Sequence, residues 1–124
     1  MKRIVIADDS ATARMFIRRC LDIIGFEGAE IVEAEHGKEA LAAVKEKPTD
    51  LLLTDLNMPV MDGETLLKWV KGNPKLMDLA VVVITSAGNP AKEQDLMALG
   101  ALRVINKPIA PPVLMEALEM FLED

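Results

Sequence analysis

The sequence predicts an α/β fold in which five parallel strands alternate with five helices that cover both faces of one sheet. Short runs rich in β-branched residues recur along the chain, and segments with apolar residues at helical spacing lie between them. Glycine and proline residues fall at the ends of these helical segments. Repeated βα units with right-handed crossovers build a parallel sheet with helices on each side.

Five short apolar runs are the expected strands, because strands buried in a parallel sheet read as continuous runs of aliphatic residues. All of them are short, as strands of globular proteins usually are. They are Arg3–Ala7, Ala29–Glu33, Asp50–Thr54, Ala80–Thr85 and Leu102–Ile105.

A helical segment follows each strand. The first has an apolar stripe and stops at Gly25, and its stripe consists of Met15, Ile17, Leu21 and Ile24. The second helix ends before Pro48, the third at Gly72 and the fourth at Gly100. The last four helices are expected at Gly37–Lys47, Gly63–Lys71, Pro90–Leu99 and Pro111–Leu122.

Composition restricts the class of protein. A chain of 124 residues with 51% apolar residues fits one domain with a sizeable core. The 20 acidic and 14 basic residues give a net charge of −6, which argues against a surface for nucleic acid or anionic membranes. The longest apolar run, residues 79–84, is far too short to cross a bilayer, and the first residues lack a signal-peptide core. We expect a cytoplasmic protein that contacts neither nucleic acid nor membrane.

Polar side chains follow four of the expected strands. Asp8 and Asp9 come after the first strand, Asp55 after the third, Thr85 ends the fourth, and Lys107 lies close beyond the fifth. Each alone is explained as a helix cap, a turn residue or a solvated charge. The carboxyl ends of parallel strands, however, meet at one edge of the sheet, where ligands bind. All five together therefore indicate a functional site.

Electrostatics indicates which chemistry such a site supports. Two carboxylates ~4 Å apart repel each other by about 4 kcal/mol at an effective dielectric constant near 20, so three need cations beside them. Lys107 offsets one, and a divalent cation offsets the rest. Oxygen ligands without histidine or cysteine favour Mg²⁺, or Mn²⁺, and the backbone carbonyl of Asn57 is a neutral candidate ligand. Mg²⁺ commonly completes its shell with phosphate oxygens, which suggests phosphoryl transfer to a carboxylate.

The chain resembles the receiver domain of two-component response regulators, above all the single-domain chemotaxis type. Four segments carry the resemblance: residues 6–10 (IADDS), residues 54–63 (TDLNMPVMDG), residues 84–87 (ITSA) and Lys107-Pro108. The ordered set covers essentially the whole chain, so we expect residues 1–124 to form one receiver domain without an attached output domain. The resemblance implies a flavodoxin-like fold with strand order 2-1-3-4-5 and a cis peptide bond between Lys107 and Pro108.

The resemblance also implies the chemistry. Asp55 would be the phosphoacceptor, which takes a phosphoryl group from the phosphohistidine of a histidine kinase or phosphotransfer protein and later loses it by autodephosphorylation. Thr85 and Lys107 would contact phosphoryl oxygens. The protein would be a phosphorylated signalling switch and not an enzyme that turns over an external substrate.

A magnesium site follows from the same resemblance. Asp9 would bind Mg²⁺ directly, Asp8 would act through a water molecule, and Asp55 with the backbone carbonyl of Asn57 would complete the protein's ligands. No other cofactor is expected.

Phosphorylation would shift the surface made by the fourth helix, the fifth strand and the fifth helix, and so dock an unknown downstream protein. We expect a monomer, with a dimer through that surface as the alternative. The output is open between a free-standing regulator, a relay intermediate, a phosphate sink and part of a longer protein. One residue departs from the family pattern: Val104 stands where an aromatic switch residue is common, and valine has too few rotamers for that role.

Two other functions fit the sequence less well. A haloacid-dehalogenase-like phosphatase needs an acid two residues after its nucleophile, where this chain has Asn57. A flavodoxin-like cofactor binder is disfavoured because no G-x-G-x-x-G or Walker pattern is present and aromatics make up only 3%. We interpret His36 as a loop residue, Cys20 as a buried packing thiol and Trp69 as partly buried.

Overall fold

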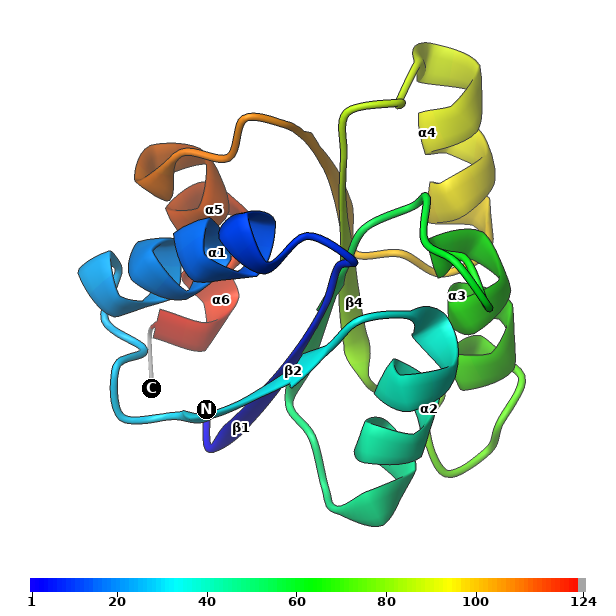
Figure 1. The fold of residues 1–124 in the computed structure, drawn as a ribbon, viewed down its shortest axis with the longest axis horizontal. Helices are drawn as coiled ribbons and strands as arrows, with labels where there is room; N and C mark the ends of the chain where they lie inside the picture. The colour runs from blue at the N-terminus through cyan, green and yellow to red at the C-terminus, as the bar shows by residue number, and fades with distance from the viewer. Residues whose placement is uncertain (123–124) are drawn as a thin grey trace.

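The computed structural model describes residues 1–122 and confirms the predicted α/β fold (Figure 1). The strands form one parallel sheet in the order β2-β1-β3-β4-β5, as the resemblance implied. Strands β1 and β4 have the predicted bounds, whereas β2, β3 and β5 each begin one residue later than predicted. The strands are β1 (Arg3–Ala7), β2 (Glu30–Ala34), β3 (Leu51–Thr54), β4 (Ala80–Thr85) and β5 (Arg103–Asn106).

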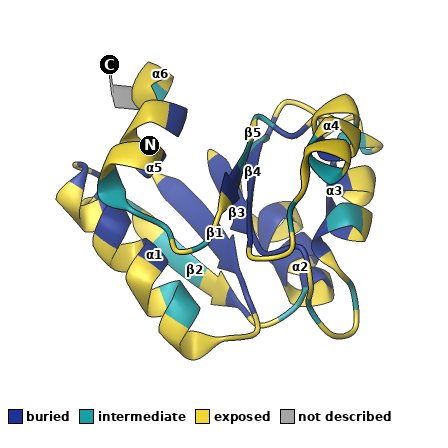
Figure 2. Cartoon of the chain, turned by 90° about the horizontal axis from the view of Figure 1, so that it is seen from above, coloured by how far each residue is buried: buried dark blue, intermediate teal, exposed yellow. Residues whose placement is uncertain are grey.

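The helices lie in two layers, with α1, α5 and α6 on one face of the sheet and α2, α3 and α4 on the other (Figures 1 and 2). They are α1 (Ala11–Ile23), α2 (Gly37–Glu46), α3 (Gly63–Lys71), α4 (Pro90–Ala98), α5 (Pro111–Ala117) and α6 (Glu119–Leu122). The prediction of a single last helix is wrong. Its expected range is divided at Leu118, whose N–H donates to the carbonyls of Leu114 and Met115 at 3.0 and 3.2 Å. None of the helices in residues 1–122 has the length and apolar character to span a bilayer.

Side-chain caps fix where the first four helices begin. Ser10, His36, Asp62 and Asn89 each accept a hydrogen bond from the backbone N–H three residues later. A cap satisfies one of the N–H groups that the first helical turn leaves without a partner. His36, interpreted from the sequence as a loop residue, acts through its Nδ1 atom, which accepts from Glu39 N–H at 3.2 Å.

The core has two layers because successive strand residues face opposite sides of the sheet. In β1, Val5 packs with the cluster under α2, α3 and α4, while Ile4 and Ile6 pack under α1 and α5. Cys20 is buried in the second cluster, as predicted, and burial raises the pKa of its thiol. It replaces Met15 in the predicted apolar stripe of the first helix, since Met15 is 42% exposed.

Several large apolar side chains lie at the surface and not in the core. The predicted partial burial of Trp69 holds for less than half of the residue, because 58% of it is exposed. Four methionines besides Met15 are also exposed: Met77, Met97, Met115 and Met120. Strand β2 is only partly covered because it lies at the edge of the sheet.

A buried arginine ties the start of β1 to the end of α2. Arg3 is 5% exposed, and its Nη1 atom donates to the carbonyls of Ala43 and Lys47 at 2.7 and 3.1 Å and to Thr49 Oγ1 at 2.9 Å. The carbonyls at a helix end lack partners within the helix, so this guanidinium supplies donors that the backbone cannot. Glu30 lies 3.6 Å from its Nε atom.

We expect Arg3→Leu to lower the free energy of unfolding by about 3 kcal/mol, since the buried carbonyls lose their donor. Urea unfolding followed by circular dichroism measures this change. Lys2→Ala is the control, because Lys2 is exposed, and its effect should stay within about 0.5 kcal/mol. Equal stability of the Arg3 variant and the control would contradict the role of Arg3.

Candidate functional site

The predicted polar residues meet at the carboxyl edge of the sheet, and the backbone of three of them extends the hydrogen-bond ladders of the strands. Asp8 N–H donates to Ala34 O at 3.0 Å, and Asp55 N–H donates to Ala7 O at 2.8 Å. Lys107 N–H donates to Thr85 O at 2.9 Å. Backbone hydrogen bonds of the sheet therefore fix the positions of Asp8, Asp55 and Lys107, independently of their side-chain contacts.

Three carboxylates gather there. Asp8, Asp9 and Asp55 each offer an oxygen that lies within 4.8 Å of the other two. Asp8 is 1% exposed and Asp55 is 8% exposed, whereas Asp9 is open to solvent. The sequence prediction that the first and third strands deliver clustered carboxylates is confirmed.

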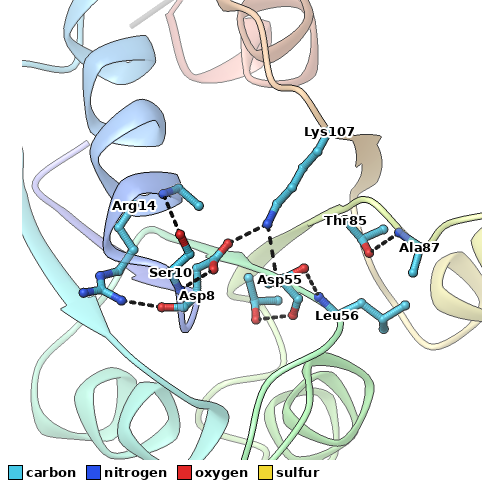
Figure 3. Close-up of polar contacts among 10 residues, drawn as sticks. Asp8, Ser10, Arg14, Asp55, Leu56, Thr85, Ala87 and Lys107 are labelled. Carbon is cyan, nitrogen blue, oxygen red and sulfur yellow. Dashed lines mark hydrogen bonds and ion pairs between the residues drawn. The ribbon is translucent and has the colours of Figure 1, made fainter.

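Lys107 reaches into this cluster from the end of β5 (Figure 3). Its Nζ atom lies 2.9 Å from Asp8 Oδ2 and 3.5 Å from Asp55 Oδ2. Burial alone lowers the pKa of the ammonium, but the hydrogen bond to Asp8 and the charge of Asp55 outweigh it, so the pKa is raised above its ordinary value. The ammonium thus stays charged and offsets part of the carboxylate repulsion. The peptide bond from Lys107 to Pro108 is cis, as implied.

The two oxygens of the Asp55 carboxylate have different partners: one accepts a backbone hydrogen bond and the other faces the Lys107 ammonium. Its Oδ1 atom accepts from Leu56 N–H at 2.8 Å, and its Oδ2 atom faces Lys107. Burial raises the pKa of the Asp55 carboxyl, and the charge of Asp8 raises it further, although Lys107 and Leu56 N–H act in the opposite direction. The carboxylate is therefore electrostatically destabilised relative to one in water, and it gains from any added positive charge.

Asp8 has no free oxygen among its protein contacts. Oδ1 accepts from Ser10 N–H at 2.8 Å, and Oδ2 accepts from Lys107. Its backbone carbonyl accepts from Arg14 Nη1, and Arg14 in turn pairs with Glu33 at 2.8 Å. The Arg14 guanidinium therefore binds two groups of the protein itself. No local sequence pattern marks this salt bridge, because Glu33 lies 19 positions away in the sequence.

Thr85 is fully buried at the end of β4. Its Oγ1 atom accepts from Ala87 N–H at 3.0 Å, and the hydroxyl keeps its own proton for donation. Asn57 lies exposed in the loop after β3, two residues beyond Asp55. Both residues occupy the sheet edge where the sequence places them.

Gly63 is a site residue that sequence reasoning missed. A Cβ atom at this position would lie 2.1 Å from the carbonyl oxygen of Asp55, so only glycine allows this approach. Its N–H donates to Leu56 O at 2.9 Å, and Thr54 Oγ1 donates to the same Asp55 carbonyl at 2.9 Å. The sequence pattern places Gly63 only at the start of a helix, because its close contact with Asp55 depends on tertiary structure.

We expect Gly63→Ala to lower the free energy of unfolding by about 3 kcal/mol, because the added methyl group displaces the backbone of Asp55. Chemical unfolding measures the change. Gly28→Ala is the matched control, since a Cβ there has nothing within 4 Å and should change stability by less than about 1 kcal/mol. A Gly63 variant as stable as the control would show that the loop gives way freely.

The donor set at this edge fits Mg²⁺. The converging ligands are carboxylate oxygens, and no histidine or cysteine is among the metal-ligand cluster found in residues 1–122. Hard divalent cations prefer such oxygens, and Mg²⁺ needs few protein ligands because it keeps several waters. Excess negative charge around a part-exposed pocket supplies the electrostatic reason for an ion to bind.

Comparisons with known proteins agree with this geometry. The sequence profile described as the response regulator receiver domain matches residues 4–119. The chain is 36% identical to chemotaxis protein CheY1 of Helicobacter pylori, over 97% of this chain and 96% of that protein. It is 36% identical to the chemotaxis protein CheY homolog of Campylobacter jejuni, over 94% and 89% of the two chains. The solved structure of Vibrio cholerae CheY4 superposes with a TM-score of 0.84 at 30% identity, covering 97% and 98%.

Proposed function

This chain belongs to the response regulator receiver domain family, and from that premise we propose that Asp55 accepts a phosphoryl group from the phosphohistidine of a histidine kinase or phosphotransfer protein. The observation that carries the proposal is the position of Asp55, which lies 3.5 Å from the half-buried Lys107 ammonium and inside a cluster of three carboxylates. The similarity to chemotaxis proteins supports a role in chemotactic signalling.

In the transfer step, an Asp55 carboxylate oxygen forms a bond to phosphorus as the P–N bond to the donor histidine breaks, and the imidazole leaves with the electron pair. Such transfer depends mainly on positioning and on stabilising charge at the phosphoryl oxygens. Lys107 supplies an ammonium beside Asp55, and the Thr85 hydroxyl supplies a hydrogen-bond donor. Hydrolysis of the acyl phosphate by water later returns the carboxylate.

The acidic cluster supports the division of ligands that the family resemblance implies. Asp9 is exposed and is the member of the cluster open to direct coordination. Both Asp8 oxygens already accept hydrogen bonds, which suits contact through water, and Asp55 with the Asn57 carbonyl would complete the set. When bound, Mg²⁺ would neutralise charge on the phosphoryl oxygens. Mn²⁺ suits the same oxygen ligands.

The test is labelling with a small phosphodonor such as acetyl phosphate. We expect incorporation that requires Mg²⁺ and is stable to acid but labile to alkali, as for an acyl phosphate, and no incorporation into Asp55→Asn. Labelling of that variant at the level of the parent protein would refute the assignment.

The proposal makes this protein a signalling switch without turnover of external substrates. Phosphorylation would shift the α4–β5–α5 surface by favouring one of two pre-existing states. Val104 is half-buried against the core beneath α4, so the switch would work without an aromatic rotamer. Retention of partner proteins with beryllium fluoride and Mg²⁺ measures the output, and hydrolysis of added phosphoesters would contradict the switch assignment.

The kinase or phosphotransfer helix has a candidate docking place beside the site. A cavity of about 510 Å³ lies between α1 and the segment after β5, lined by Phe16, Ile17, Pro108, Ile109 and Lys107 among others. Phe16 is 52% exposed. An apolar rim next to the phosphoacceptor suits a helix that presents a phosphohistidine.

We expect Phe16→Asp to slow phosphotransfer from a phosphorylated histidine phosphotransfer domain at least ~10-fold, because truncating a central aromatic commonly costs over 1 kcal/mol of binding. Labelling by acetyl phosphate should be unchanged. Ile23→Asp is the control on the same helix, since Ile23 is 69% exposed and does not line the cavity. Equal rates for both variants would place the docking surface elsewhere.

A further inference from the structure

Helices α2 and α3 lie side by side on the face of the sheet opposite α1 (Figure 1). Residues of both helices and of the loop after α3 line a groove. Its volume is about 570 Å³. Lys45 of α2 lines one wall, Thr65, Lys68 and Trp69 of α3 line the other, and the loop with Pro74 closes one end. We call it the Trp69 groove. It lies outside the phosphoacceptor site and outside the α4–β5–α5 surface.

The Trp69 groove is lined by positive charge, whereas the whole protein carries a negative net charge. The chain has a net charge of −6, yet the described residues that line the groove include two lysines and no acid. Lys45 has no ion pair in residues 1–122. Lys68 lies 3.7 Å from Glu64, but that carboxylate is also bound by Lys92, so two ammonium groups share one acid. The groove therefore keeps uncompensated positive charge.

The apolar part of the groove is an exposed tryptophan. Trp69 is 58% exposed and is the only tryptophan of the chain. An exposed indole is a large apolar surface with a polar N–H, and tryptophan is enriched among the residues that dominate protein interfaces. Trp69 lines the groove together with Lys45 and Lys68, whose ammonium groups prefer carboxylates.

The end of the groove is preorganised. Gly72 N–H donates to Lys68 O at 2.9 Å, and Asn73 N–H donates to Val70 O at 3.2 Å. Asn73 Oδ1 accepts from Lys75 N–H at 2.9 Å, which fixes the turn that carries Pro74. A loop that is already ordered loses little conformational entropy when a partner binds.

We propose that the Trp69 groove docks an acidic segment of a partner protein, whose carboxylates pair with Lys45 and Lys68 while an apolar side chain packs on Trp69. Charge complementarity selects this occupant over a basic or neutral one. None of the three residues contacts the phosphoacceptor, so docking here is independent of the state of Asp55. The groove would serve as a constant attachment point, separate from any surface that responds to phosphorylation.

Titration with the peptide acetyl-Glu-Leu-Glu-Glu-Leu-Glu-amide tests the proposal, and Trp69 fluorescence reports binding directly. We expect a saturable change with a dissociation constant in the range of ~1 mM or tighter, weakened by salt. Lys45→Gln/Lys68→Gln should weaken binding at least ~10-fold, as should Trp69→Leu when calorimetry replaces fluorescence. Arg19→Glu on α1 is the matched control, because it changes the net charge by the same two units away from the groove, and Asp55→Asn should bind like the parent.

Three binding results would overturn the proposal. They are no saturable change, equal binding of a control peptide in which every Glu is replaced by Lys, or equal affinity of the double Gln variant and Arg19→Glu. Sedimentation could also reveal a dimer that Trp69→Leu abolishes. That result would overturn the proposal, because the groove would then bind a second copy of this chain. Because Asp55→Asn is tested in the same series, failure here is distinguishable from failure of the phosphoacceptor assignment.

Discussion

Replacing Lys107 with methionine is expected to lower the free energy of unfolding by about 3 kcal/mol at neutral pH, because it strands a buried carboxylate without its cation. Asp8 is 1% exposed, and Lys107 Nζ is its charged partner at 2.9 Å. Asp55, 3.5 Å from the same ammonium, loses its partner as well. Methionine keeps most of the side-chain volume, so the change reports charge more than packing. Urea unfolding at neutral pH measures it.

Lys92→Met is the control for this prediction. Lys92 also pairs with a carboxylate, Glu64, but the Glu64 side chain is 25% exposed whereas that of Asp8 is 1% exposed. Loss of the Lys92 pair should therefore cost only about 0.2–1 kcal/mol. Addition of Mg²⁺ should restore part of the stability of Lys107→Met, since the ion supplies the missing positive charge. Two variants of equal stability would mean that Lys107 does not neutralise the acidic cluster.

The pH dependence of the Lys107 contribution has a definite sign. The pKa of Lys107 is raised in the folded protein, so the folded state holds this proton more tightly than the unfolded state. Its stabilising contribution is therefore fully present below its ordinary value of 10.5 and is lost as the pH rises through the folded-state pKa. The parent protein should lose more stability than Lys107→Met in that alkaline range.

Asp55→Asn is expected to abolish phosphorylation and at the same time to stabilise the fold by about 1 kcal/mol at neutral pH. The pKa of Asp55 is raised in the folded protein, first by burial and then by Asp8, so the ionised carboxylate opposes folding. An amide of the same shape carries no charge and still accepts from Leu56 N–H. The ionised carboxylate of the phosphoacceptor therefore lowers the free energy of unfolding.

The size of this stabilisation changes with pH in a way that unfolding curves can measure. A raised folded-state pKa means that stability falls as the pH rises from the ordinary value of 3.8 through the folded-state pKa. The advantage of Asp55→Asn should therefore vanish below the ordinary value and be full above the raised one. Mg²⁺ should narrow the gap at neutral pH by binding the parent more tightly. A variant less stable than the parent at neutral pH would contradict the electrostatic account of the site.

The fold was predictable because its strands and helices carry separate hydrophobic periods. β1 and β4, buried along almost their whole length, have the predicted bounds, and the other three strands each begin only one residue later than predicted. The break at Leu118 was missed because the apolar pattern continues across it into α6. Side-chain periodicity shows which face of a helix is apolar, but not where its hydrogen bonds change partners.

The residues of the site were predictable from the sequence, but the residues that position them were not. Asp8, Asp9 and Asp55 follow from one rule, that parallel strands end at the same edge, and the structure clusters them. The roles of Gly63 and Arg14 depend on contacts that no local sequence pattern records.

The central claim is that Asp55 carries phosphate between Lys107 and a divalent ion, and a crystal structure with Mg²⁺ and beryllium fluoride tests it most directly. We expect the fluoride adduct on an Asp55 oxygen, with Lys107 and Thr85 on two of its fluorine atoms and Mg²⁺ beside Asp9. An adduct on any other side chain, or an ion bound away from the three carboxylates, would contradict the account.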